Sequence, residues 1–143
     1  MELTKEILDR ILTQVEHTRD VVVCSMDETG YPNAKAMFLR KHEGLQTFWF
    51  STNVSASRTM RFLENPKACL YFMDSDSIHG LMLTGEMKVF MDNETKQAFW
   101  EPDDIRYYQQ GPTDPDYCMM CFTAEKGNYW GKGKYEFDIT SLK

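Results

Sequence analysis

The chain has 143 residues, 42% of them hydrophobic, and this length predicts a single domain, residues 1–143, around one core. Its formal net charge of −6 at pH 7 argues against nucleic acid as a partner, because nucleic acid is bound by basic surfaces. No apolar run approaches the length of a membrane span and the N-terminus lacks a secretory signal pattern, which predicts a cytoplasmic protein with no membrane partner.

The first half of the chain predicts helix, then strands, then helix. Residues 3–15 place apolar side chains at helical spacing behind Thr4, which is a good N-cap. Residues 20–26 are rich in β-branched side chains, and a turn at 28–30 leads to a second extended run, so this pair predicts a hairpin. This second run is the strand predicted at 33–41. A strand at 45–51 and a helix at 55–63 that ends before Asn65-Pro66 follow it.

The second half predicts four more strands around a polar segment that is compatible with short helices. Its elements in chain order are strands at 68–73 and 81–91, short helices at 93–100 and 103–109 separated by Pro102, a loop at 111–116, and strands at 117–123 and 135–139.

The whole pattern is mainly β with inserted helices. About seven strands are linked mostly by short turns, and the helices do not alternate with them. A parallel sheet would need a helical crossover between successive strands, so this order favours a closed antiparallel barrel.

One segment of this acidic chain is cationic. Between Asn33 and Lys67 there are six Lys or Arg residues and two Glu residues, a local charge of +4. A local cationic island in an acidic protein indicates a site for a small anion such as a phosphate group.

A polar loop, Ser51 to Arg58, lies inside this segment and leads from a predicted strand into a predicted helix. The first turn of a helix has backbone N–H groups without intrahelical partners, and the helix dipole favours an anion there. Ser57 and Arg58 are therefore candidates for closing around a phosphate. The alternative is that Asn53 or Ser55 merely caps the helix while Arg58 points into solvent.

The remaining chemistry-bearing residues predict no metal site. Four cysteines, at 24, 69, 118 and 121, lie inside apolar runs, which favours reduced thiols over a disulfide framework. Cys118 and Cys121 have the spacing of half a zinc site, but no second pair exists and the three histidines are scattered. His79 is a haem-ligand candidate, although a solitary strand histidine is more often a surface or packed residue.

Several short motifs occur in a fixed order along almost the whole chain. They are Lys35-Ala36-Met37-Phe38-Leu39-Arg40, Phe48-Trp49-Phe50-Ser51-Thr52-Asn53, Ser57-Arg58, Glu64-Asn65-Pro66-Lys67-Ala68, Gly111-Pro112-Thr113-Asp114-Pro115-Asp116-Tyr117 and Tyr129-Trp130. With these motifs the chain resembles the flavin-binding split-barrel family typified by pyridoxamine 5′-phosphate oxidase, particularly its short general-stress-protein branch.

The resemblance implies an antiparallel split β-barrel that forms a homodimer and holds FMN at the subunit interface. By position, basic residues of the second strand and the Ser-Arg pair that starts the following helix would take the phosphate. Backbone and apolar groups of the second strand would meet the flavin ring, and Trp130 would approach a flavin bound mainly by the partner chain. The residues assigned to the cofactor in this way are Lys35, Met37, Phe38, Arg40, Ser51, Thr52, Ser57, Arg58, Thr59 and Trp130.

Three departures from the oxidase pattern bear on activity. Thr59 stands where the oxidase has lysine, Gly80 stands where it has a flavin-contacting glutamine, and no C-terminal Arg-x-His segment follows Leu142. Oxidation of pyridoxamine phosphate is therefore not expected.

The spacing of the strand cations adds a geometric condition. Lys35 and Arg40 are an odd number of residues apart, so they share one face of a strand only across a bend or bulge. The alternative is that Lys41, in phase with Lys35, takes the place of Arg40 or that one of these cations is a surface residue.

No motif of an acid, base or nucleophile is present, and we predict no dedicated catalytic residue. The expected function is FMN-dependent redox chemistry with an unidentified small-molecule electron donor or acceptor. The alternatives are a non-catalytic flavin-binding or stress-associated protein and a relative that binds haem or deazaflavin, because a fold alone does not choose between them.

Overall fold

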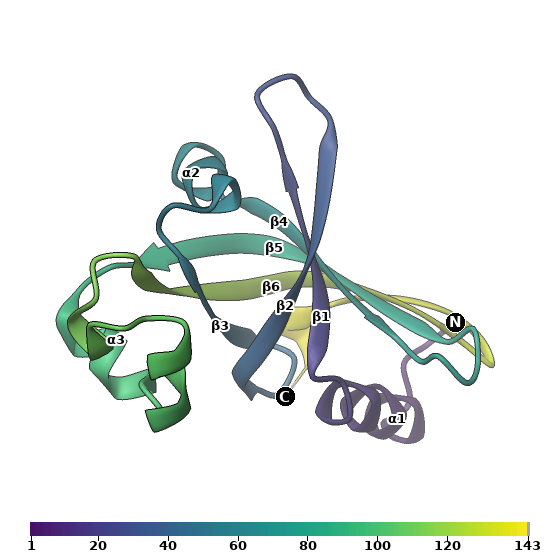
Figure 1. Cartoon of the computed structure of the whole chain (residues 1–143). Helices are drawn as coiled ribbons and strands as arrows, with labels where there is room; N and C mark the ends of the chain where they lie inside the picture. Colours follow the sequence, from purple (N-terminus) through teal and green to yellow (C-terminus); the bar gives the residue numbers. More distant parts are fainter. Residues whose placement is uncertain (143) are drawn as a thin grey trace.

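The computed structural model describes residues 1–142, which fold into seven strands, three α-helices and short 3₁₀ turns (Figure 1). The helices are α1 (Lys5–Glu16), α2 (Ser57–Glu64) and α3 (Asn93–Phe99). The strands are β1 (Asp20–Met26), β2 (Pro32–Glu43), β3 (Thr47–Asn53), β4 (Lys67–Met73), β5 (Gly80–Phe90), β6 (Tyr117–Gly131) and β7 (Gly133–Asp138). None of the helices described is long and apolar enough to cross a membrane.

The sheet closes on itself. Its strands follow the order β3-β2-β1-β4-β5-β6-β7, and β3 also pairs with β6 over its whole length, so six antiparallel strands form a closed barrel. The seventh strand, β7, extends the sheet beyond β6. The predicted mainly β architecture and the closed antiparallel barrel are confirmed.

The barrel interior is filled by side chains that alternate along each strand. In β3 the residues Phe48 and Phe50 are fully buried while their neighbours are partly exposed, and Leu70 and Phe72 of β4 follow the same period of two. Phe48 packs at 5.5 Å, centroid to centroid, against the ring of Phe72. The two segments lie within the strands predicted at 45–51 and 68–73, and the alternation itself is a finding of the structure.

Helix α1 and the segment around α3 lie at different ends of the barrel, with α1 beside β1 and α3 near the far ends of β5 and β6 (Figure 1). The hydroxyl of Thr4 accepts a hydrogen bond from the backbone N–H of Ile7, which confirms the predicted cap. Ile11 and Val15 of the same helix are fully buried in the core.

Most predicted bounds shift by one or two residues, and three elements differ more clearly in extent or type. Strand β6 runs to Gly131 and not to residue 123, because a register shift opposite Thr84 and Gly85 leaves Glu125 without a partner and the strand continues beyond it. The second short helix is a 3₁₀ turn, Pro102–Arg106, that begins at the proline, where a missing N–H costs nothing. The predicted loop at 111–116 contains a further 3₁₀ turn, Gly111–Thr113.

Gly85→Ala is expected to destabilise the barrel at this bulge. A Cβ on Gly85 would meet the backbone carbonyl oxygen of Thr123 across the strand pair, and backbone atoms are not free to move aside. We expect the free energy of unfolding in urea to fall by about 1–3 kcal/mol, the usual cost of overpacking. Glu125→Ala, at the exposed bulged residue, is the control; equal stability of the Gly85 and Glu125 variants would contradict the prediction.

Candidate anion-binding site

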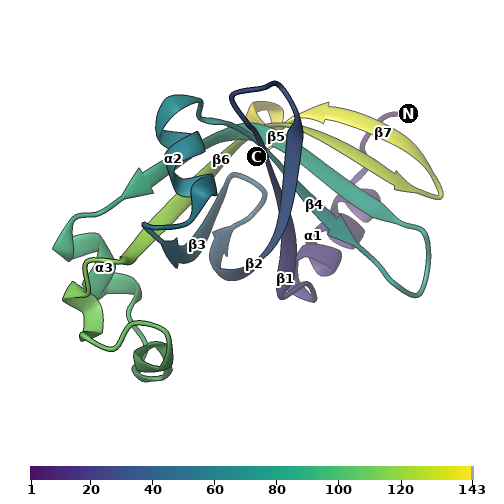
Figure 2. The same cartoon turned by 45° about the horizontal axis from the view of Figure 1, so that its top comes forward.

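A small cationic pocket lies between α2 and the strands β1 and β2. Its volume is about 230 Å³, and three of its lining residues, Lys35, Arg58 and Arg61, carry positive charge. Among residues 1–142, no carboxylate lines the pocket. Its other lining residues are Val23, Ser25, Asn33, Ala34, Ser57 and Phe62. In Figure 2 the β1–β2 hairpin and α2 lie beside each other at the top of the molecule.

Register and helical period together build this pocket. Lys35 of β2 is the register partner of Val23 of β1, and paired residues project from the same face of the sheet. Lys35 therefore lies on the face to which the buried Val23 points. Arg58 and Arg61 are three residues apart on α2 and therefore occupy one side of the helix. Sequence reasoning selected Lys35 and Arg58 and missed Arg61, although the three-residue spacing is a signal that could have found it.

Arg58 is the residue best prepared to bind an anion. One of its terminal nitrogens, Nη2, donates to the hydroxyl of Thr52 at 2.5 Å, while its Nε is buried and has no hydrogen-bond partner in residues 1–142. Burial lowers the pKa of the Arg58 guanidinium, with the charges of Tyr108 and Cys118 acting in the opposite direction. A buried guanidinium N–H without a partner is costly, and a phosphate oxygen would satisfy it with a charge-assisted hydrogen bond. The residues of the pocket therefore fit a phosphate group.

The start of α2 is uncapped by any side chain. Its N-cap is Ala56, so the alternative in which Asn53 or Ser55 caps the helix is wrong. Instead the Asp116 carboxylate holds the loop: Asn53 Nδ2 and the backbone N–H of Ser55 each donate to it at 2.8 Å. The first turn of α2 thus keeps the positive end of its dipole without a side-chain acceptor.

The loop before α2 is expected to loosen at low pH. Hydrogen bonds from the Asn53 side chain and the Ser55 backbone hold the pKa of the Asp116 carboxyl below its ordinary value. A carboxyl whose folded pKa is lowered stabilises the fold above its unfolded pKa of about 3.9 and loses this contribution as pH falls below it. The protection factor of the Ser55 amide, its exchange rate corrected for the intrinsic pH effect, should fall in the native protein from pH 5 to pH 3 and should stay constant in Asp116→Asn.

Arg40 lies outside the pocket. Its guanidinium forms an ion pair with Asp104 at 3.0 Å and donates to the carbonyl oxygen of Phe99 at 2.8 Å and to the hydroxyl of Ser51 at 3.0 Å. The strand does contain the bulge that the odd spacing required, between Leu39 and Lys41, but the ion pair holds Arg40 to the segment that follows α3. Lys41 does not line the pocket either.

The other predicted residues are distributed around the barrel. Of the ten, the structure brings Lys35, Ser57 and Arg58 into the pocket, and Thr52 contacts it through Arg58. Thr59 is fully buried and its hydroxyl donates to the carbonyl oxygen of Asn53 at 2.7 Å, so it supports the loop.

The remaining three, Met37, Phe38 and Trp130, divide between core and surface. Met37 is 5% exposed and belongs to the core, whereas Phe38 is 48% and Trp130 51% exposed. Trp130 pairs with Gly80, and a Cβ on Gly80 would meet the ring end of the partly exposed Tyr71 side chain.

Part of the outer face of the barrel is apolar and exposed. Phe38 of β2 and Tyr71 and Met73 of β4 all project from it, because the register of β1 with its two neighbours places them on the side opposite the core. Exposed apolar residues gathered on one sheet face are typical of a protein–protein contact.

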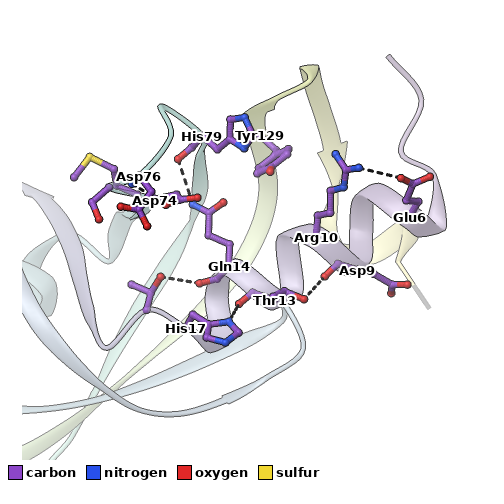
Figure 3. A pocket seen from close by; sticks show the side chains of 13 residues that line it. Glu6, Asp9, Arg10, Thr13, Gln14, His17, Asp74, Asp76, His79 and Tyr129 are labelled. Atoms are coloured by element: carbon purple, nitrogen blue, oxygen red, sulfur yellow. Dashed lines mark hydrogen bonds and ion pairs between the residues drawn. The ribbon is translucent and has the colours of Figure 1, made fainter.

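A larger cavity, of about 710 Å³, lies between α1 and the β4–β5 loop (Figure 3). None of the predicted cofactor residues lines it. His79, the haem-ligand candidate, does so, with its ring edge-on to Tyr129 at 6.4 Å. The side-chain amide of Gln14 donates to the carbonyl oxygen of Phe72 in β4 at 2.8 Å and to that of His79 at 3.4 Å, and Figure 3 shows the second of these contacts. Within residues 1–142 no group of three or more His, Cys, Asp or Glu side chains is placed to hold a metal ion.

The fold is thus a closed six-stranded antiparallel barrel with a cationic pocket between the strands β1 and β2 and the helix α2. Residues 6–143 match the model of the pyridoxamine 5′-phosphate oxidase-like family. The chain belongs to this family. Among curated proteins, no sequence matches the chain significantly.

Solved structures support the same assignment. The chain is similar to a Clostridium acetobutylicum protein related to general stress protein 26 of B. subtilis, of the pyridoxinephosphate oxidase family, with 39% identity, a TM-score of 0.90 and coverage of 99% of this chain and 100% of that one. General stress protein 26 of Bacillus anthracis has the same fold at 16% identity, with a TM-score of 0.76 and coverage of 94% and 99%. A pyridoxamine 5′-phosphate oxidase-related, FMN-binding protein of Nostoc punctiforme has it at 11% identity, with a TM-score of 0.66 and coverage of 95% and 89%.

Proposed function

We propose that this protein binds FMN, with the phosphate in the cationic pocket, and acts as a flavin-dependent oxidoreductase on a small molecule. The observation that carries the proposal is the buried Nε of Arg58, which has no partner in the described chain and belongs to a pocket with three cations and no carboxylate. When bound, FMN supplies hydride or electron transfer. The FMN-binding relative from Nostoc punctiforme supports the choice of this phosphate ester over others.

The chain's own residues would bind and orient the cofactor. Lys35, Arg58 and Arg61 neutralise the phosphate dianion, Ser57 at the first position of α2 adds a hydroxyl, and Thr52 fixes the guanidinium of Arg58. The polar groups that line the pocket are cations, hydroxyls and one amide, and the described part of the chain places no carboxylate, histidine or thiol there to act as a general base. The proposal therefore assigns positioning, and no proton transfer, to these side chains.

The proposal includes a homodimer. The pocket takes only the phosphate end of FMN, and the flavin ring needs apolar walls beyond it. The exposed apolar residues Phe38, Tyr71 and Met73 offer a second copy of the chain a face on which to dock, and the exposed Trp130 of that copy would reach the ring. Phe38→Asp is expected to give a monomer that releases FMN, measured by light scattering and flavin fluorescence; a monomer of full affinity would remove the dimer from the proposal.

The visible spectrum of the purified protein, taken after FMN is added and the excess is removed, tests the cofactor. We expect about one flavin per chain, identified by the mass of the released ligand. No retained flavin overturns the proposal, and retention of deazaflavin or haem in its place would assign the alternative cofactor.

Turnover then separates an enzyme from a binding protein. Reduction of the bound flavin by NADH or NADPH and its reoxidation by a quinone or nitro compound should be faster than for free FMN at the same concentration. Equal rates would favour the second candidate, a protein that stores flavin without a substrate of its own. The lining of the pocket, which offers no general base in the described residues, is the observation that favours this candidate.

A further inference from the structure

Two cysteines lie directly opposite each other on neighbouring strands of the outer face. Cys24 of β1 and Cys69 of β4 are partners in the antiparallel register, where they follow the pairs Val22–Tyr71 and Val23–Leu70. Directly opposed residues of antiparallel strands have their Cα atoms about 4.5–5.5 Å apart. This separation lies within the range that a disulfide bond spans, about 4.4–6.8 Å.

The two side chains also point to the same side of the sheet. Along β1 the residues that flank Cys24, Val23 and Ser25, are buried, and along β4 the flanking Ala68 and Leu70 are buried too. Both cysteines are free and half-buried. Because successive strand residues alternate between faces, the two thiols face outward together.

The environment of Cys69 keeps its thiol protonated. Burial is the main cause that raises the pKa of Cys69 to about 11, and the neighbouring Cys24 acts in the same direction. Cys69 therefore stays protonated near neutral pH, and we assign the first attack to Cys24.

We propose that Cys24 and Cys69 form a reversible intrachain disulfide that links β1 to β4. The oxidant is a small-molecule disulfide such as oxidised glutathione. The Cys24 thiolate attacks one of its sulfur atoms and releases one thiol; Cys69 then loses its proton, attacks the Cys24 sulfur of the mixed disulfide and releases the second thiol. Two protein thiols are oxidised and one glutathione disulfide is reduced to two thiols. Once Cys24 is in the mixed disulfide, its charge no longer opposes ionisation of Cys69.

The other two cysteines provide an internal comparison. Cys118 and Cys121 are buried on β6, where Cys118 pairs with Thr52 and Cys121 with Trp49 and Lys88. Neither has a cysteine as its register partner. They are expected to remain reduced under conditions that oxidise the Cys24–Cys69 pair.

The disulfide would act on the part of the barrel that carries the cationic pocket. Val23 and Ser25, which flank Cys24, line that pocket from the other face of β1. A bond to β4 fixes this strand and closes a loop through β2, β3 and α2. The disulfide should therefore raise the melting temperature by roughly 5–10 °C, because it closes the loop between Cys24 and Cys69 and restricts the unfolded chain. The bond itself does not depend on FMN.

Incubation of the purified protein with oxidised glutathione, followed by mass spectrometry of the intact chain and of its peptides, tests the inference. We expect an intact mass lower by two hydrogens, a peptide cross-link between Cys24 and Cys69, and return to the starting mass with dithiothreitol. The pair shares the face offered to a second copy of the chain, so the reaction is run at high and low protein concentration.

Two variants sharpen the test. Cys69→Ser should end as a stable mixed disulfide of glutathione at Cys24, with no gain in melting temperature, whereas Cys121→Ala should oxidise like the original chain. A stable mixed disulfide in the unmodified protein, a cross-link between two chains, or no reaction at either concentration would each overturn the proposal. These outcomes are independent of flavin binding, so failure here leaves the proposed function to its own test.

Discussion

Arg58→Ala should weaken FMN binding by about 1.5–3 kcal/mol, or about 10- to 150-fold in Kd, as expected when a charge-assisted hydrogen bond to phosphate is lost. The guanidinium already lies in the pocket, and its buried Nε has no partner in residues 1–142. Quenching of FMN fluorescence, titrated at one ionic strength, measures the change.

Stability and affinity must be separated in this experiment. Arg58 donates to the hydroxyl of Thr52, so its removal also deletes one intramolecular hydrogen bond. The cofactor-free variant should lose only about 1 kcal/mol of unfolding free energy, the usual contribution of such a bond. If FMN binding were weaker only because the variant is partly unfolded, the cofactor-free variant would lose clearly more unfolding free energy than this.

Matched substitutions identify the geometry of the contact. Arg58→Lys keeps the charge but not the planar fork, and it should recover only part of the affinity. Arg106→Ala removes an exposed cation outside the pocket and should leave the Kd unchanged. An unchanged Kd in Arg58→Ala would exclude Arg58 from the site and, with it, the observation on which the proposed function rests.

The barrel was predictable from the sequence because local patterns determine most of it. The apolar runs that form β3 and β4 and the cap at Thr4 follow from neighbouring residues along the chain. The full length of β6 was not predictable in this way. Its outer half contains Glu125 and Lys126 in succession, and only the register shift against β5 explains how a strand accommodates both exposed charges.

The site was predictable only in part, since it depends on contacts distant in sequence. Lys35 and Arg58 meet because β2 lies beside β1 and α2 packs above them. Arg40 matches the same motif, yet an aspartate 64 residues away holds it elsewhere. No local pattern distinguishes a cation that is free to bind a phosphate from one that is already paired across the fold. Asp116, which fixes the loop before α2, is a distant partner of the same kind.

Arg40→Met is expected to cost about 3–5 kcal/mol of unfolding free energy, because it leaves a nearly buried carboxylate without its cation. The side chains of Arg40 and Asp104 are only 12% and 13% exposed, and Arg40 also serves the carbonyl of Phe99 and the hydroxyl of Ser51. Asp104 would retain one donor, the backbone N–H of Glu101. Urea unfolding measures the loss.

The double variant Arg40→Met/Asp104→Leu decides between two roles for Arg40. If the arginine clamps the segment after α3 to the barrel, replacing both charges with apolar side chains should restore most of the lost stability, since a buried ion pair contributes little over an apolar pair of similar size. FMN affinity of the double variant should then equal that of the original chain. If Arg40 instead leaves Asp104 to bind the phosphate, the double variant will be stable and bind FMN at least tenfold more weakly, a loss of about 1.4 kcal/mol. That result would move the phosphate site toward β3 and the segment after α3, away from Lys35 and Arg61.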